Sequence, residues 1–293
     1  MAFPGEEGDG ENADVASDSG DEGPGLFTSM FADTELETTA HSFPNPFFGH
    51  SAEVDPSSSS SSLTVKLKAL HPSTGQTLSS TGLTLWRAAP QLCEYLTTNA
   101  STFISNKRVL ELGSGVGLVG ILASYLKPGE VYLTDGDTDT LKGMRANISL
   151  NSSSSNANDT NIHSHQLIWS DEGSKTFLGD HGTFDTILGS DIIYVPEVIV
   201  PLFQTVDRLL KPYCEEMDAS QTTADDAGLG MILPRQQPAF VLSYARRNVK
   251  IDLVQEEARR RGFKVIVPEG SEGCWVFERQ APPTIEGELL VKT

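Results

Sequence analysis

The order of strand-like and helix-like segments constrains this fold more than any other feature of the sequence. Between residues 108 and 261, short apolar runs alternate with longer segments of helical periodicity, which is typical of a parallel sheet with helical crossovers. Only Pro268 to Gly273 separate the last two predicted strands. This connection is too short for a crossover helix, so these strands should pair antiparallel. We therefore predict an α/β fold with a doubly wound, mostly parallel, seven-stranded sheet and an antiparallel terminal strand.

The same patterns predict where each strand and helix lies. Strands are predicted at 108–112, 130–135, 165–169, 184–189, 240–244, 263–267 and 274–278, with a further half-buried strand at 65–70. Helices are predicted at 88–96, 118–125, 138–150, 197–210 and 251–261.

Charge is distributed unevenly along the chain. Residues 1–60 hold six Asp and seven Glu but no Lys or Arg, and the first Lys is Lys66. Such a segment buries too little apolar surface to offset its ordering entropy. We therefore predict a disordered acidic tail, which is either a solubilising tail or a docking arm for a basic partner. The predicted boundaries are the tail at 1–62, a folded domain at 63–280 with low-complexity loops at 152–161 and 214–237, and a C-terminal tail at 281–293.

The composition argues against several classes of protein. A net charge of −19 without a basic stripe argues against direct binding of nucleic acid. The three cysteines, Cys93, Cys214 and Cys274, are too widely spaced for a zinc or redox motif, so we expect no metal site and a reducing compartment. We find no secretory signal and no apolar run of about 18 residues. We expect a cytoplasmic monomer without membrane contact, with the nucleus as an alternative location.

A glycine-rich loop, Glu111-Leu-Gly-Ser-Gly-Val-Gly117, joins a predicted strand to a predicted helix. Glycines permit positive φ and close approach of a ligand, and Gly115, Gly117 and Gly120 also match the dinucleotide fingerprint. The next strand ends at Asp135, whose carboxylate can accept both hydroxyls of a ribose. These features fit a nicotinamide dinucleotide and S-adenosylmethionine alike. Glycines that serve only a tight turn are the structural alternative.

A second strand end carries a carboxylate and an aromatic side chain. Residues 184–188 predict a buried strand, which is followed by Asp191 and Tyr194. Ligands bind outside the carboxyl ends of the strands in open α/β sheets, so both side chains should border a crevice. The structural alternatives are a helix N-cap for Asp191 and packing beneath the following helix for Tyr194. We predict that Asp137, in contrast, is a helix N-cap.

Two tryptophans lie where a cofactor could contact them. Trp86 precedes the first predicted helix, and Trp169 ends the third predicted strand. Each could stack on an adenine or face a sulfonium, and packing in the core is the alternative for both.

Six motifs occur along the chain in a characteristic order. They are Thr-Gly-Leu-Thr-Leu-Trp86, Glu111-Leu-Gly-Ser-Gly-Val-Gly-Leu-Val-Gly120, Leu133-Thr-Asp135, Arg145-Ala-Asn147-Ile-Ser-Leu-Asn151, Trp169 and Asp191-Ile-Ile-Tyr194. The series resembles the seven-β-strand, S-adenosylmethionine-dependent protein-lysine methyltransferases (methyltransferase family 16), which have the class I, Rossmann-like fold. The resemblance covers roughly Leu63 to Arg279. The acidic tail and the inserts after Asn151 and between Cys214 and Gln237 depart from the family pattern.

The resemblance implies a role for each matched position. It implies a cofactor site for S-adenosylmethionine made by Trp86 at its border, Glu111, Gly113, Ser114, Gly115 and Gly117 in the loop, Asp135 at the ribose, Trp169 at the adenine and Ser190 through its backbone. It implies that Asp191 and Tyr194 are the catalytic, substrate-side pair and that no metal takes part. Asp191 would orient the incoming amine rather than act as a strong general base.

The implied activity is methyl transfer to a lysine ε-amine of a protein, such as a translation factor or a chaperone. The sequence leaves three alternatives open. A small-molecule N-methyltransferase could use the same fold, and a non-catalytic scaffold that binds S-adenosylmethionine could keep it. An NAD-dependent oxidoreductase fits the glycine spacing but lacks an evident hydride-transfer histidine or a Tyr-x-x-x-Lys pair.

Overall fold

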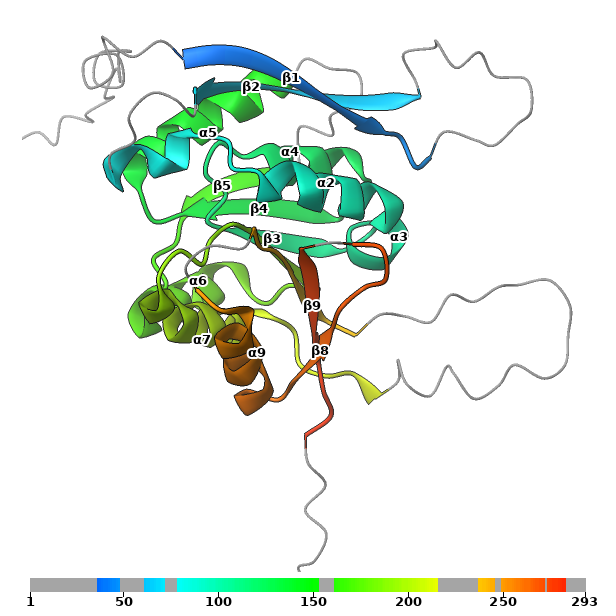
Figure 1. Ribbon diagram of the computed structural model, residues 1–293, viewed down its shortest axis with the longest axis vertical. Coiled ribbons are helices and arrows are strands. Elements are labelled where there is room, and N and C mark those ends of the chain that lie inside the picture. Colours follow the sequence, from blue (N-terminus) through cyan, green and yellow to red (C-terminus); the bar gives the residue numbers. More distant parts are fainter. Residues whose placement is uncertain are drawn as a thin grey trace, which may run out of the picture. The chain divides into compact units, whose positions relative to one another are not determined.

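Seven strands form a mixed sheet in the order β5-β4-β3-β6-β7-β9-β8 (Figure 1). The computed structural model describes residues 36–47, 61–71, 78–152, 161–215, 237–245, 249–271 and 273–282. The strands of the sheet are β3 (Arg108–Leu112), β4 (Glu130–Asp135), β5 (Ile162–Gln166), β6 (Thr186–Ser190), β7 (Ala239–Ser243), β8 (Phe263–Ile266) and β9 (Cys274–Arg279). Neighbouring strands are parallel except that β9 runs antiparallel to both β7 and β8. This arrangement confirms the predicted doubly wound sheet with its antiparallel end.

Helices cover both faces of this sheet (Figure 1). One face packs against α2 (Ala88–Thr98), α4 (Leu118–Tyr125) and α5 (Thr138–Asn151), and the other against α6 (Asp171–His181), α7 (Ile199–Leu209) and α9 (Ile251–Arg260). The short elements are η1 (Leu78–Leu83), α3 (Ala100–Phe103) and η2 (Pro196–Val198). None of the helices within the described ranges has the length and apolarity needed to cross a membrane.

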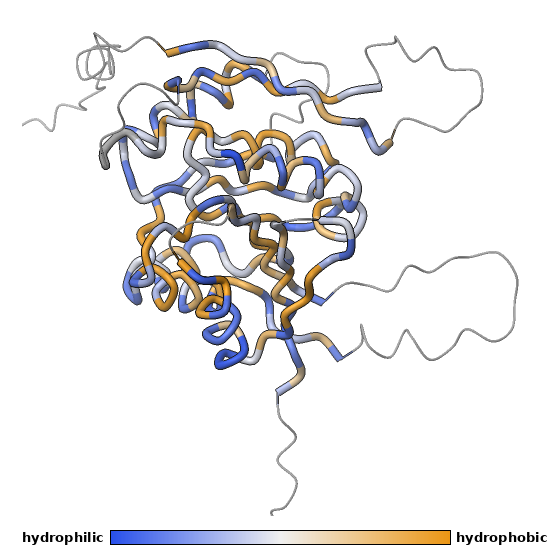
Figure 2. Tube along the Cα trace, in the orientation of Figure 1, coloured by the Kyte–Doolittle hydropathy of each residue, from blue (hydrophilic) through white to orange (hydrophobic). Residues whose placement is uncertain are grey.

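The helices differ in how much of their surface they bury. All eight residues of α4 are buried, as expected for a helix that is apolar on every side. In contrast, α9 buries only Val254, Glu257 and Ala258, and Figure 2 shows hydrophilic residues along its outer part. The central position of α4 places the loop that precedes it next to the middle of the sheet.

A separate two-stranded sheet contains β1 (Leu36–Pro44) and β2 (Ser62–Leu70), which are antiparallel. Because β1 lies within the tail that we predicted to be disordered, that prediction is wrong for residues 36–44. Most β1 side chains are exposed, so the strand has little apolar signal. Its backbone nevertheless pairs with β2 along its whole length, and Phe43 is buried. Residues 1–35 and 48–60 of the predicted tail, residues 153–160 and 216–236 of the predicted loops, and residues 283–293 lie outside the described residues.

Two asparagines of α5 hold β2 against the main domain. The side-chain oxygen of Asn147 accepts a hydrogen bond from the amide of Lys68 (2.7 Å), and its amide donates to the carbonyl of Lys68 (3.1 Å). Asn151 makes the same pair of bonds with Lys66, at 2.9 and 2.7 Å. Because Asn147 and Asn151 are four residues apart on a helix, they face the same way. They therefore bond alternate residues of the strand.

Candidate active site

The strand order reverses between β3 and β6, and doubly wound sheets form their ligand crevice at such a point. From β3 the chain continues to β4 on one side, whereas β6 and β7 lie on the other side. Ligands bind at such a switch point, outside the carboxyl ends of the strands. Because Leu112 is paired in register with Gly189, the glycine loop after β3 and the residues after β6 leave the sheet side by side.

Segments that follow three different strands meet at Gly113. A Cβ atom on this residue would lie 2.7 Å from Cγ2 of Ile192 and 3.5 Å from a ring carbon of Trp169. Gly113, Trp169 and Ile192 follow β3, β5 and β6 respectively. The prediction that Trp169 ends a strand is wrong, since β5 stops at Gln166 and Trp169 lies in the connection to α6. Ser170 then caps α6, since its hydroxyl accepts a hydrogen bond from the amide of Gly173 (3.0 Å).

Asp135 connects the end of β4 to the glycine loop. Its Oδ2 accepts a hydrogen bond from the amide of Gly115 (3.1 Å), and its Oδ1 accepts one from the amide of Asp137 (3.1 Å). Burial raises the pKa of Asp135, while these backbone bonds oppose the rise. The predicted N-cap is confirmed, since Oδ1 of Asp137 accepts from the amide of Thr140 at 2.7 Å.

Glu111 lies beneath the loop rather than in the crevice. Its side chain is 1% exposed, and its Oε2 accepts a hydrogen bond from the amide of Gly120 in α4 (2.9 Å). Burial raises the pKa of Glu111 to about 8, although the hydrogen bond from the amide of Gly120 acts to lower it. Gly117 also faces inward, because a Cβ there would meet Leu133 and Met144 at 3.3 Å. These two predicted cofactor residues therefore support the loop from below.

Ser114 ties the loop to β4. Its amide donates to the carbonyl of Thr134 (2.8 Å), and its hydroxyl accepts from the amide of Thr134 (3.1 Å). The loop thus has a fixed path between β3 and α4.

The segment before α2 packs on the glycine loop. The indole Nε1 of Trp86 donates to the carbonyl of Thr81 (2.9 Å). In the same turn, the carbonyl oxygen of Gly82 lies 3.1 Å from the position of a Cβ on Gly115. Trp86 is partly exposed, so it is not a fully buried core residue.

Asp191 adopts an unusual backbone conformation directly after β6. Its φ is +57°, in the left-handed region where Asn and Asp are the common residues other than Gly. Its amide donates to the carbonyl of Ser243 (2.9 Å), and its Oδ1 accepts from the amide of Ala245 (3.2 Å). The side chain is 8% exposed. The alternative role as a helix N-cap is wrong, since the N-cap residues of η2 and α7 are Val195 and Val198, and neither makes a side-chain cap bond.

Tyr194 and Ser190 flank Asp191. Tyr194 is 55% exposed, so packing beneath the following helix is wrong for this residue. Ser190 is paired in register with Ser243 at the last position of β6 and is partly exposed. The structure therefore brings Ser190, Asp191 and Tyr194 to the same edge of the sheet as the glycine loop.

Two contributors to this site were not predicted from the sequence. Ile192 lies inside the Asp191-Ile-Ile-Tyr194 motif, so its apolar side chain was the available signal. Ala245 acts through its backbone amide, which leaves no side-chain signature. Within the described ranges, no group of three or more His, Cys, Asp or Glu side chains is arranged to hold a metal ion.

The chain is similar to several known proteins. A family model described as lysine methyltransferase matches residues 69–221. Protein N-lysine methyltransferase METTL21A of Danio rerio is 35% identical over 125 residues, which cover 43% of this chain and 54% of that protein. Protein-lysine N-methyltransferase EFM3 of Chaetomium thermophilum is 32% identical over 137 residues, which cover 45% and 40% of the two chains.

Among solved structures, magnesium protoporphyrin IX methyltransferase of Synechocystis PCC 6803 with bound SAM aligns with a TM-score of 0.44 and 14% identity, over 70% of this chain and 86% of that one. The chain spans about half the length, or less, of the curated relatives it matches. The family match covers more than half of the sequence and includes every residue of the crevice from Trp86 to Tyr194. The chain therefore belongs to the lysine methyltransferase family.

Proposed function

We propose that this protein binds S-adenosylmethionine in the crevice between β3 and β6 and transfers its methyl group to a lysine ε-amine of a protein. The observation that carries the proposal is the family match over residues 69–221, because it contains every proposed cofactor and substrate residue from Trp86 to Tyr194. Relatives named as protein-lysine methyltransferases support a protein substrate. Three free cysteines support a reducing compartment, and we propose a cytoplasmic monomer.

The residues of the crevice fit the proposed cofactor. A carboxylate offers about four lone-pair sites, and the bonds from Gly115 and Asp137 leave acceptor capacity on Asp135 for two neighbouring ribose hydroxyls. Gly113 and Gly115 have positive φ and no side chain, so a ligand can approach the loop backbone. Trp169 and Ile192 offer apolar surface beside Gly113.

When bound, S-adenosylmethionine supplies an electrophilic methyl group on a sulfonium. The lysine nitrogen must be neutral to attack. From a reference pKa of about 10.4, losing the proton to solvent near pH 7.4 costs about 4 kcal/mol. An ionised Asp191 would stabilise the ammonium form, so we assign this carboxylate to orientation of the amine through a charge-assisted hydrogen bond. The amide of Ala245 holds the carboxylate in place, and the exposed Tyr194 borders the entry of the lysine side chain.

The left-handed backbone of Asp191 determines the best variant for testing this role. Asn tolerates this conformation better than Ala, so Asp191→Asn removes the charge with the least strain. We expect transfer of radiolabelled methyl into lysate proteins to fall roughly tenfold to hundredfold, since hydrogen bonds to charged groups contribute about 1.5–3 kcal/mol. Affinity for S-adenosylhomocysteine, measured by calorimetry, should not change.

Controls separate this proposal from its alternatives. Asp252→Asn, at an exposed position of α9, should transfer methyl at the wild-type rate. Methyl transfer by Asp191→Asn at the wild-type rate would contradict the proposed role of Asp191. Label that appears only in small molecules would favour a small-molecule methyltransferase, and cofactor binding without any transfer would favour a scaffold.

A further inference from the structure

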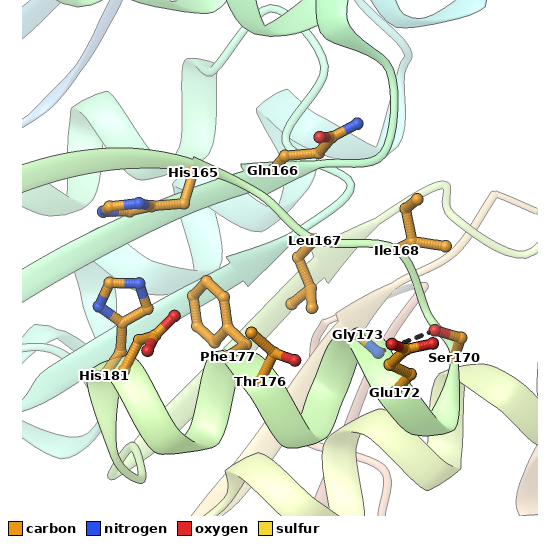
Figure 3. Close-up of a pocket in the computed structure, with 11 residues that line it drawn as sticks. His165, Gln166, Leu167, Ile168, Ser170, Glu172, Gly173, Thr176, Phe177 and His181 are labelled. Atoms are coloured by element: carbon orange, nitrogen blue, oxygen red, sulfur yellow. Dashed lines mark hydrogen bonds between the residues drawn. The ribbon is translucent and has the colours of Figure 1, made fainter. Parts of the chain in front are cut away.

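A groove of about 420 Å³ lies between α6 and the chain that runs from the end of β5 toward Ser170 (Figure 3). Its strand side begins at His165, and its helix side includes Thr176 and Phe177. None of the residues assigned to the cofactor or to the incoming lysine lines it. The groove therefore differs from the crevice between β3 and β6.

The inner wall of the groove is aromatic. The ring centroids of His165 and His181 are 4.4 Å apart, and those of Phe177 and His181 are 4.5 Å apart. Burial lowers the pKa of His165, and the neighbouring His181, His163 and Arg145 act in the same direction, against Asp180. The imidazole of His165 is therefore mainly neutral near pH 7. Aromatic surface suits the aliphatic stem and the charged head of a basic side chain.

The outer rim of the groove carries two carboxylates. Glu172 and Asp180 both line the groove and are exposed. They are eight positions apart on α6, with Thr176 midway between them, so they lie about 12 Å apart along the helix. Among the described residues, the ion pairs of α6 involve Lys175 and Arg208 with Asp171, and neither Glu172 nor Asp180 takes part in one.

We propose that this groove docks an extended basic segment of the protein substrate, with one Lys or Arg at Glu172 and another at Asp180. The inference rests on the proposed function, since it names a feature of the methylated partner. A separation of 12 Å corresponds to about four residues of extended chain at 3.3 Å per residue. Residues i and i+4 of an extended chain also point the same way. The docked segment is therefore expected to contain two basic residues with three residues between them.

The docked segment is distinct from the lysine that is methylated. In the strand order, β5 and β6 are three positions apart, so at about 4.8 Å per strand the groove lies roughly 14 Å from the end of β6. A basic side chain in the groove and a lysine at Asp191 must therefore be at least about four extended residues apart, or on different parts of a folded partner.

The test uses a fluorescein-labelled nonapeptide with Lys at positions 3 and 7 and Ser or Thr elsewhere. Its anisotropy is measured at about 0.15 M salt with the full chain and with two double variants. Glu172→Lys with Asp180→Lys reverses the charge of the groove. Asp252→Lys with Glu256→Lys makes the same charge change at exposed positions of α9. Circular dichroism and thermal midpoints confirm that all three proteins are folded.

We expect the groove variant to bind the peptide at least tenfold more weakly than wild type and the α9 variant to bind it within twofold. A peptide with Glu at positions 3 and 7 should not bind. Equal losses of peptide affinity in both double variants would show general attraction to an acidic chain and would overturn the proposal. Unchanged peptide binding by the groove variant would also overturn it. Calorimetry with S-adenosylhomocysteine is a separate readout: failure of wild type to bind it would refute the proposed function and not the peptide docking.

Discussion

The carbonyl oxygen of Gly82 lies 3.1 Å from the position that a Cβ atom on Gly115 would occupy. Gly115 also has a φ of +53°, which costs an L-residue about 1–2 kcal/mol. Gly115→Ala should therefore lower the free energy of unfolding by about this amount and weaken binding of S-adenosylhomocysteine. Gly179→Ala is the matched control, because nothing lies within 4 Å of its Cβ position in α6. For Gly179→Ala, urea titration should show a gain of up to about 1 kcal/mol in the free energy of unfolding. A loss of stability equal to that of Gly115→Ala would contradict the argument.

Variants of Asp135 and Asp137 should affect different properties, namely cofactor binding and helix stability. Asp135→Asn removes the charge that we assign to the ribose hydroxyls, so affinity for S-adenosylhomocysteine should fall roughly tenfold to hundredfold. Asp137→Ala removes the N-cap of α5 and should cost about 1 kcal/mol of stability with little change in affinity. Calorimetry and urea titration on both variants test this contrast, which would fail if the affinity losses were similar.

The pKa of Glu111, raised to about 8 by burial, should make stability depend on pH. The folded state keeps a proton that the unfolded state releases above about pH 4.5, so stability should decline as pH rises from about 4.5 to 8. Glu111→Gln stays neutral and can still accept the bond from Gly120. Its thermal midpoint should therefore fall less between pH 5 and 8 than that of wild type. A control, Glu256→Gln on the exposed side of α9, should follow the wild-type curve, and parallel curves for all three proteins would count against a buried neutral Glu111.

Loss of one asparagine of α5 should release part of β2. Asn151→Ala leaves the amide and the carbonyl of Lys66 without their side-chain partner, at a cost of about 1–3 kcal/mol. In the Asn151→Ala variant, hydrogen exchange should speed up at the amide of Lys66 and in β1 more than in β3, relative to wild type. Ser149→Ala, on the exposed side of the same helix, should leave the exchange of β2 unchanged. Protection of Lys66 that survives Asn151→Ala would show that other contacts hold β2.

The central part of the fold could be predicted from the sequence because its strands are buried. Residues of β3 and β6 are almost all buried, which gives continuous apolar runs, and the short link between β8 and β9 determined their antiparallel pairing. The edge strand β5 is only partly buried and contains His163 and His165. Its apolar signal is therefore weak, and its predicted position was shifted along the chain by about three residues.

The elements that were missed have few buried side chains of their own. Helix α6 buries only Ser174 and Phe177, so it lacks an apolar stripe, although Ser170 and two following acidic residues form a recognisable helix start. The positions of Asp135 and Asp191 at strand ends followed from the sequence. The bonds that fix them did not, because backbone amides such as those of Gly115 and Ala245 are invisible to a motif.

The hydrogen bonds that Asn147 and Asn151 of α5 make with β2 have a consequence for the behaviour of the protein at high concentration. The edge of a two-stranded sheet ordinarily presents unpaired amides and carbonyls, which can recruit a strand from another molecule. In this protein Asn147 and Asn151 occupy that edge through Lys66 and Lys68, in the place where a third strand would lie. A helix thus covers the β2 edge of this sheet with two side chains, so another strand cannot pair there.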